Sequence, residues 1–390
     1  LVTSRLPLNI KMEQRLLVSG LDLPSETGSG AGGDARAAAA VRLFEQEARR
    51  MQPGFKLSPQ NETAVIHICR LVHGIPLAIT FAAGWLRLMT AQQIAAEIEQ
   101  NLDFLASSMR DVPERHRSLR AVFQQSWQML CDSEKRALAQ SAIFCGTFSL
   151  DALLTITQAA HSDLANLLDR SFLERVGDNR YTLHELLRQF STEKLAENPE
   201  TAASTAARHA RYYLEFVGSN EPLLFGPDSH YALQNLENEL GNIDRAWGTA
   251  VNQREWSLIE ESLDGLVHFS MLSGYYTQIA GMLDQAQARI DGQKNPLLAG
   301  YLVAHQANIF IRKGHFKKAA AALEQAQEIA LAQNDRRLHA RTNMSLGRLF
   351  ELQGSYDKGL AALQEAHYYY DQARNTVRLA RISRLMGNLF

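Results

Sequence analysis

Two short segments, far apart in the sequence, hold the residues best suited to contact a ligand: Gly74–Ala78 and Tyr181–Glu185. In the first, Pro76 follows a glycine. A proline ring is rigid and has no N–H, so it can lie flat in an apolar pocket without stranding a donor. The second places His184 beside an acid, and Arg5 ends an apolar, strand-like N-terminal segment. We take these residues as candidates for ligand contact.

Three other patterns suggest chemistry that the sequence does not support. Gly28–Gly33 has the glycine spacing of a phosphate-binding loop, but Asp34 stands where lysine is needed and no strand precedes it. His184 begins a zinc-protease pattern, but Arg188 replaces the second histidine ligand. No Gly-x-Ser-x-Gly elbow positions a nucleophilic serine. We therefore expect no catalytic residue and no metal site, and the unpatterned Cys69, Cys131 and Cys145 indicate no disulfide framework.

The C-terminal region repeats with a period of 40 residues. Each repeat has a glycine followed two positions later by an aromatic residue, and small and apolar residues keep the same register. These positions predict a helix, a turn and a second helix, with the small residues permitting close helix packing. The pattern from Trp256 to Phe390 resembles tetratricopeptide repeats in their longer bacterial form. The repeating positions are Gly274, Gly314 and Gly354; Tyr276, Phe316 and Tyr356; Leu283, Leu323 and Leu363; Ala286, Ala326 and Ala366; and Ala307, Gly347 and Gly387.

Repeats of this family usually offer a concave surface to a partner. Residues 301–390 hold 13 Lys/Arg against 7 Asp/Glu, so this part of the chain is basic. A basic groove could receive an acidic ligand or a C-terminal carboxylate through charge-assisted hydrogen bonds; alternatively, its arginines are simply solvated. On the family pattern the groove-facing residues are Asn308, Arg341, Arg348, Arg381, Arg384 and Asn388.

The middle of the chain predicts a winged helix. Several short helices precede a hairpin whose strands are 172–176 and 180–183, joined by the turn 177–179. Phe172, Val176, Tyr181 and Leu183 alternate as one buried face should. The helix expected at about 162–170 contains two aspartates and one arginine. The phosphates that line a DNA groove repel an acidic helix, so we expect this winged helix to be a structural domain rather than a DNA-binding one.

In this order, the motifs resemble those of the NB-ARC class of bacterial signal-transducing (STAND) ATPases. Gly74–Ala78 resembles the family's GxPLA motif, which implies that Gly74, Pro76 and Leu77 lie at the adenine. Leu183-His184-Glu185 resembles the methionine-histidine-aspartate motif, which implies that His184 contacts the diphosphate of ADP. Arg5 matches the arginine that senses the terminal phosphate. Leucine for methionine and glutamate for aspartate are departures, and residues 236–243 look like the connector before the repeats.

The resemblance implies a mostly α chain with five parts: a remnant of an α/β P-loop nucleotide-binding domain (1–56), a helical lid (57–110), a winged helix with a small β-hairpin (111–198), a helical connector (199–255) and a tetratricopeptide α-solenoid (256–390). The chain opens on Leu1 rather than Met and ends inside an apolar pattern, so we expect a fragment lacking the P-loop.

The implied function is a regulatory switch, as in transcriptional regulators of this family. ADP would hold the domains closed, and a protein or small-molecule ligand on the repeats would favour ATP and self-association. Mg²⁺ would bind only in an intact parent that supplies the P-loop, so we expect this chain alone not to hydrolyse ATP. The alternative is a passive repeat scaffold without nucleotide binding. Ordinary composition, with 46% apolar residues and no span-length apolar run, predicts a cytoplasmic protein with no membrane contact.

Overall fold

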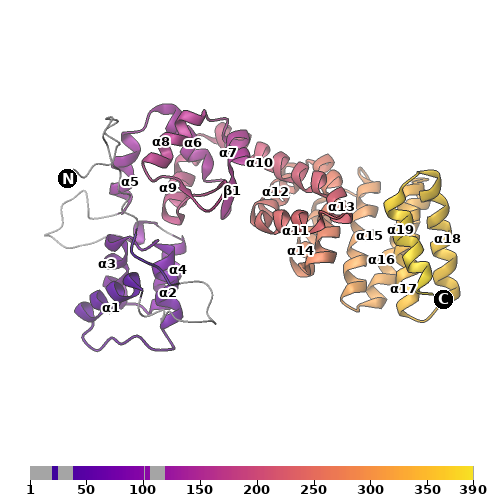
Figure 1. Ribbon diagram of the computed structural model, residues 1–390, viewed down its shortest axis with the longest axis horizontal. Helices are drawn as coiled ribbons and strands as arrows, with labels where there is room; N and C mark the ends of the chain where they lie inside the picture. Colours follow the sequence, from indigo (N-terminus) through magenta and orange to yellow (C-terminus); the bar gives the residue numbers. More distant parts are fainter. Residues whose placement is uncertain (1–19, 25–37, 101, 106–118, 390) are drawn as a thin grey trace. The chain divides into compact units, whose positions relative to one another are not determined.

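The computed structural model describes residues 20–24, 38–100, 102–105 and 119–389. The chain divides into two compact units, Leu1–Thr205 and Ala206–Phe390, whose elements are labelled in Figure 1. The described elements are helical except for one small sheet, as the sequence predicts. The five finer boundaries drawn from the sequence remain predictions. Arg5 and Gly28–Gly33 lie outside the described residues.

In the described part of the first unit, the first four α-helices form two pairs. Helix α1 packs on α3, and α2 packs on α4. Helix α3 is apolar nearly all round and buries Ala78, Ile79 and Phe81. Helix α1 is amphipathic and buries one stripe that includes Phe44. The elements are α1 (Ala39–Met51), α2 (Glu62–Leu71), α3 (Pro76–Gly84), the 3₁₀ turn η2 (Trp85–Arg87), α4 (Ala91–Gln100) and the 3₁₀ turn η3 (Leu102–Phe104).

A winged helix follows in the same unit, as predicted. Strands β1, β3 and β2 form one antiparallel sheet in that order, with the helices before and between them supplying the core. The fully buried Phe144 and Phe148 stack at 4.1 Å beside the first strand. The elements are α5 (Leu119–Gln128), α6 (Asp132–Ser141), β1 (Thr147–Ser149), α7 (Leu150–Thr157), α8 (His161–Asp169), β2 (Glu174–Arg175), β3 (Arg180–Thr182) and α9 (Glu185–Ala196).

The hairpin corrects one sequence prediction. Val176 is 46% exposed and does not share the buried face of Tyr181. The strand register pairs Arg175 with Tyr181, so Arg175 is on the same face as Tyr181 and Val176 is on the opposite face. The backbone N–H of Val176 donates to Arg180 O at the turn. Alternation counted across the turn fails because the turn residues shift the phase of the second strand.

The second unit is built from helices throughout its described length. Helix α10 (Pro199–Asn220) passes from the first unit into the second. Trp247 is fully buried in α12 and donates its indole N–H to Met282 O of α14. The remaining elements are the 3₁₀ turn η5 (Pro222–Phe225), α11 (Ser229–Asn238), α12 (Leu240–Gln253), α13 (Trp256–Ser273), α14 (Tyr276–Arg289), α15 (Pro296–Arg312), α16 (Phe316–Ala332), α17 (Arg336–Leu352), α18 (Tyr356–Gln372) and α19 (Thr376–Gly387).

The 40-residue period marks one helix pair per repeat, and α13/α14, α15/α16 and α17/α18 are the three pairs. Gly274, Gly314 and Gly354 end or follow the first helix of each pair with φ between +71° and +87°, a conformation that favours glycine. The aromatic residue two positions later begins the second helix. The repeating leucines and alanines of the second helices are fully buried. The stack of helix pairs therefore forms an α-solenoid.

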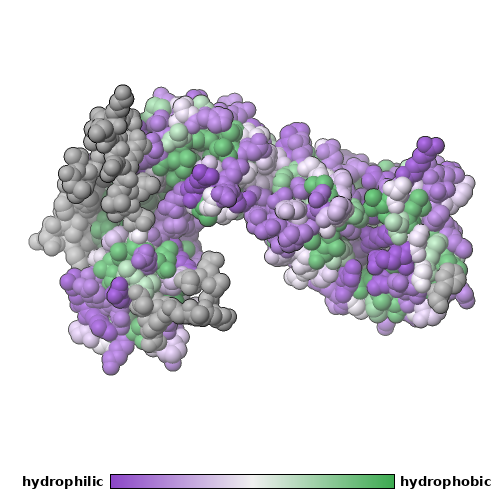
Figure 2. Space-filling view, in the orientation of Figure 1, coloured by the Kyte–Doolittle hydropathy of each residue, from purple (hydrophilic) through white to green (hydrophobic). Residues whose placement is uncertain are grey.

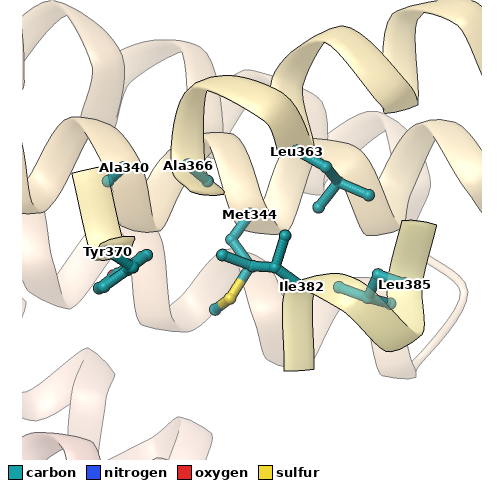
Figure 3. Close-up of a cluster of buried hydrophobic side chains, with 7 residues drawn as sticks. All are labelled: Ala340, Met344, Leu363, Ala366, Tyr370, Ile382 and Leu385. Atoms are coloured by element: carbon teal, nitrogen blue, oxygen red, sulfur yellow. The ribbon is translucent and has the colours of Figure 1, made fainter. Parts of the chain in front are cut away.

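The last repeat shows how the small residues act. Ala340, Met344, Leu363, Ala366, Tyr370, Ile382 and Leu385 of α17, α18 and α19 form one buried apolar cluster (Figure 3). A Cβ added to Gly347 would lie 2.5 Å from Leu363 Cγ. Glycine at this position thus allows α17 and α18 to approach closely. No helix in the described part of the chain has both the length and the apolar character of a membrane span.

Candidate functional site

The turn between α2 and α3 requires glycine for two reasons. His73 and Gly74 both have positive φ, +52° and +66°, and Gly74 N–H closes the turn on Cys69 O at 3.0 Å. A Cβ on Gly74 would lie only 2.3 Å from Leu21 O. Leu21 N–H donates to Gly74 O at 2.9 Å, so residues 20–24 lie directly against this turn. The first motif is therefore a tight backbone junction.

Gly20 also allows residues 20–24 to lie close to the turn between α2 and α3. A Cβ on Gly20 would lie 2.1 Å from His73 O. Arg70 of α2 donates to Pro24 O at 3.1 Å, and Ala40 N–H at the start of α1 donates to Asp22 O. Residues 20–24 thus connect α1 to the end of α2, and they hold the turn before Pro76 in place.

Pro76 occupies the first turn of α3, where a missing N–H costs no helical hydrogen bond. Its ring is exposed, Leu77 is half-buried, and Ala78 and Ile79 are buried beneath them. The helix begins at Pro76, and its N-cap residue, Ile75, provides no side-chain hydrogen bond. The proline therefore presents an apolar face to solvent at the end of a rigid helix.

His184 lies against this turn. It is the N-cap of α9, where its Nδ1 accepts the backbone N–H of Leu186 at 3.2 Å. Its ring packs on the ring of His73 with centroids 4.0 Å apart and planes at 42°. His73 also lies 4.0 Å from Glu174 of the hairpin. The two motifs that the sequence separates are therefore brought together, with His73 as the contact between them.

The environment of His184 fixes its protonation. Burial, with a smaller effect from His73, lowers the pKa of His184 to about 3, and the nearby Val72 carbonyl acts only weakly in the other direction. The neutral ring accepts at Nδ1, so its proton is on Nε2. That Nε2–H is buried, and the Val72 carbonyl near the ring is its one weak acceptor among the described residues, without the geometry of a full hydrogen bond. A buried donor without a full hydrogen bond is costly, and a ligand acceptor would satisfy it.

Two sets of polar contacts join helix α4 and the 3₁₀ turn η3 to the winged helix. Gln189 of α9 donates to Ile98 O at 3.1 Å and to Glu99 O at 3.0 Å, which caps the end of α4. Arg120 of α5 forms ion pairs with Asp103 and Glu193. Helix α9 therefore positions His184 and also contacts the end of α4.

A shallow pocket of about 520 Å³ is lined by His73 but not by His184 or Pro76. Its charged groups are already paired: His67 with Glu99 at 2.7 Å, and Arg188 with Glu185 through two hydrogen bonds of 2.7 and 2.8 Å. Glu185, the departure from the family motif, thus has an intrahelical partner. The pocket offers no spare arginine for a phosphate, since Arg70, its remaining arginine, donates to Pro24 O.

Sequence reasoning missed His73 and Gln189. His73 directly precedes Gly74, so its place in the motif's own turn was a signal. Gln189 follows His184 by five positions on a helix and gave no signal of its own, because its acceptors are backbone atoms of α4. No group of three metal-ligating side chains capable of holding a metal ion occurs among the described residues.

The six residues predicted to face a groove have different environments. Arg341 is 4% exposed and ion-paired with Asp264, and Arg348 pairs with Glu351 at 2.6 Å. Asn388 also donates to Glu351, and Asn308 accepts from Ser345. Arg381 and Asn308 line a small pocket, whereas Arg384 is exposed. Their role in binding stays a prediction.

Comparisons with known proteins give relatives by sequence, and no family model matches the chain. The chain is 32% identical over 274 residues to proteins of Mycobacterium bovis and Mycobacterium tuberculosis named "Putative HTH-type transcriptional regulator". The match covers 67% of this chain but only 29% of those relatives. An "Uncharacterized protein" of Mycobacterium bovis is 30% identical over 186 residues, covering 44% of this chain and 47% of the relative.

The chain is also similar to solved structures. One of them is the crystal structure of a signal transduction ATPase with numerous domains (STAND) with a tetratricopeptide repeat sensor from Pyrococcus horikoshii. The likeness covers 89% of this chain and 62% of that one, at 14% identity and a TM-score of 0.24. A score this low supports no argument about this chain.

Proposed function

We propose that this chain is part of a regulatory protein switched by ADP and ATP, in which the winged helix and the helical lid close on the nucleotide. The observation that supports it best is the contact of His184 with the His73–Gly74 turn. Pro76 offers an apolar face for adenine, and the buried Nε2–H of His184, which lacks a hydrogen bond of full geometry, offers a donor for a phosphate oxygen.

The arrangement suits a switch because the nucleotide would contact two elements at once. A ligand shifts an equilibrium only through contacts that one state makes and the other lacks. If α9 moved away from α3, His184 would leave the nucleotide and the closed state would lose that hydrogen bond. Arg5 would contact the terminal phosphate, and a P-loop supplied by the intact protein would hold the other phosphates and Mg²⁺.

The intact protein would use this switch to regulate transcription, as the names of its mycobacterial relatives suggest. In this proposal the repeats receive a protein or small-molecule ligand and the intact protein then self-associates. The winged helix serves as scaffold: α8 contains Asp163 and Asp169, and Arg170 at its end is committed to Glu134 and Met129 O.

ADP retention tests the proposal. The intact protein is purified as wild type, His184→Ala and His184→Gln, and the ADP released on denaturation is measured per mole of protein. Loss of a hydrogen bond to a charged phosphate should weaken retention by about tenfold or more in the alanine variant. His161→Ala, an exposed histidine on α8, is the matched control and should retain ADP like the wild type.

Two results would contradict the proposal. Equal ADP content in the wild type and both His184 variants would remove the histidine from the site. No ADP in any sample, together with normal signalling by the His184 variants, would favour the passive scaffold. A parallel assay of this chain alone should detect no ATP turnover, because phosphoryl transfer needs the P-loop lysine and the Mg²⁺-binding acid.

A further inference from the structure

The second unit contains a buried ion network that links α13, α15, α17 and α19, which alternate with the second helices of the pairs. Asp264 of α13 pairs with Arg341 of α17 and lies 2.9 Å from His305 Nε2 of α15 and 3.3 Å from Arg378 of α19. Burial alone would raise the pKa of Asp264, but Arg341, His305 and Arg378 hold it well below its usual range. Asp264 is thus a fixed negative charge among cations.

The arginines outnumber the carboxylates in this region. Two adjoining pockets share Asp264, Arg341 and Arg378; Arg337 and Glu221 line only the larger pocket, and Arg381 only the smaller. On the outer side of Arg337, a further pocket adds Glu260 and Glu261. The inner arginines Arg341, Arg378 and Arg381 have Asp264 and Glu221 as the carboxylates of their two pockets. Burial, reinforced by Arg378 and Arg341, lowers the pKa of Arg381 to about 10. Three inner arginines against two carboxylates favour an incoming anion.

The larger pocket also contains a donor with no partner. The Tyr370 hydroxyl is buried, since the residue is 3% exposed, and it forms no hydrogen bond with any described residue. Arg341 Nε is likewise buried and unpaired. Native proteins rarely leave such groups unsatisfied. Both residues line the same pocket, so one acceptor group placed there could receive hydrogen bonds from both.

Arg378 has spare capacity as well. Its guanidinium has five N–H donors, and it lies 3.3 Å from Asp264 and 3.8 Å from Glu221. Burial and then Asp264 raise the pKa of Glu221, so this carboxylate is poorly stabilised as a counter-ion. Arg378 can therefore bind a further oxygen acid in the pocket.

The size and rim of the pocket indicate the ligand class. Its volume is about 250 Å³, which is roughly eight water volumes at about 30 Å³ each. Phe225, Pro222 and Val377 form an apolar side, and Arg337, 57% exposed, lies at the mouth. Figure 2 shows hydrophilic and apolar surface side by side over the part of the view where α17 and α19 lie. A small molecule with an acid group and an apolar group matches these walls.

We propose that this pocket binds a small organic anion, with its carboxylate or phosphate on Arg337, Arg378 and the Tyr370 hydroxyl and its apolar part against Phe225 and Val377. The inference rests on the proposed function in one respect, since it makes the repeats the ligand-binding part of the regulator. It differs from the sequence prediction because Arg348, Arg384 and Asn388 do not line the pocket.

An anion titration of the whole chain tests the site. Binding of inorganic phosphate and of butyrate is measured by calorimetry and by the rise in unfolding temperature, with sodium chloride at matched ionic strength as reference. Tyr370→Phe removes only the unpaired hydroxyl and Arg337→Gln removes a largely exposed guanidinium, so both variants should fold. Each should weaken binding by about tenfold. Tyr368→Phe and Arg336→Gln, exposed neighbours on the same helices, should bind like the wild type.

The outcomes separate the two acid groups and decide the proposal. Saturable binding of phosphate alone supports a phosphate ligand, and binding of butyrate alone supports a carboxylate; both require the loss in Tyr370→Phe and Arg337→Gln. No binding beyond chloride, or binding unchanged in these two variants, would overturn the site. The titration contains no nucleotide, so its failure leaves the ADP proposal standing, and failure of the ADP test leaves the titration unaffected.

Discussion

Gly347 is a residue whose importance comes from its missing side chain. A Cβ there would lie 2.5 Å from Leu363 Cγ, and Leu363 is fully buried among α17, α18 and α19. Gly347→Ala should therefore lower the free energy of unfolding by about 1–3 kcal/mol through overpacking. Urea denaturation followed by circular dichroism measures the loss.

The control for Gly347 is another helical glycine. Gly281 of α14 is exposed, and an added Cβ would meet no atom within 4 Å. Gly281→Ala should raise stability by up to about 1 kcal/mol, because alanine favours the helix. Similar effects of both substitutions would show that helix propensity, rather than the contact with Leu363, dominates at Gly347.

His184 should make stability depend on pH. Its pKa is about 3 in the folded chain against 6.5 for an ordinary histidine, so the unfolded chain binds more protons between these values. Its stabilising contribution is complete above about pH 6.5 and falls as the pH drops, by up to about 1.4 kcal/mol per pH unit.

His184→Gln should reduce this acid sensitivity. The exchange rates of amide hydrogens in α9 give the unfolding free energy, which is compared between pH 7.5 and 5.5 for the wild type and the variant. The other buried histidines, His209, His268 and His305, lie in the second unit and keep their own pH dependence there. An unchanged pH dependence in α9 would mean that the ring is protonated in the folded chain.

At the scale of elements, the sequence predicted the two motifs but not the contact between them. Gly74 and Pro76 indicate the start of a helix, and His184 indicates a helix cap, because these are local preferences. Their contact depends on His73 and on the docking of α9 by Gln189, which bonds to backbone carbonyls that carry no sequence identity. Local rules cannot specify such a partner.

The 40-residue period predicted the repeat helices correctly, whereas the alternation of apolar residues predicted one strand residue wrongly. The 40-residue period placed the helix pairs correctly, because every repeat must bury the same face against the next. Alternation placed Val176 wrongly, since a hairpin turn resets the phase between strands. Likewise, the pattern that assigned Arg341 to a groove could not reveal Asp264, its counter-ion two helix pairs earlier in the repeat stack.

The cap on α4 is a prediction about an element. Gln189→Ala would leave Ile98 O and Glu99 O without their donor, at a cost of about 1–2 kcal/mol. Amide exchange at the end of α4 should therefore increase while α6 stays protected. Thr192→Ala on the same helix is the control, because its hydroxyl donates to Arg188 O of its own helix. Equal effects of the two variants would exclude a specific cap.

At the scale of the whole molecule, the chain separates its two candidate sites between its two compact units. The histidine junction lies within Leu1–Thr205, and the ion network and its pockets lie within Ala206–Phe390. The first gathers neutral and paired groups around one unsatisfied donor. The second gathers excess positive charge. Each site can therefore be perturbed by substitutions confined to its own unit.

Asp264→Asn tests how far such a perturbation extends. The substitution leaves Arg341 and Arg378 buried without their shared carboxylate, and breaking a buried ion pair from one side costs about 3–5 kcal/mol. Amide exchange should rise in α13, α15, α17 and α19, whose residues form the network. Asp371→Asn, an exposed aspartate at the end of α18, should leave exchange unchanged.

Amide exchange in the first unit shows whether the effect of Asp264→Asn stays within the second unit. Because every described partner of Asp264 lies in the second unit, the helices around His184 should keep their wild-type exchange rates in Asp264→Asn. A rise in α2, α3 and α9 as well would show that the two units unfold in one cooperative transition, so that breaking a charge pair in the repeats is felt at the histidine junction.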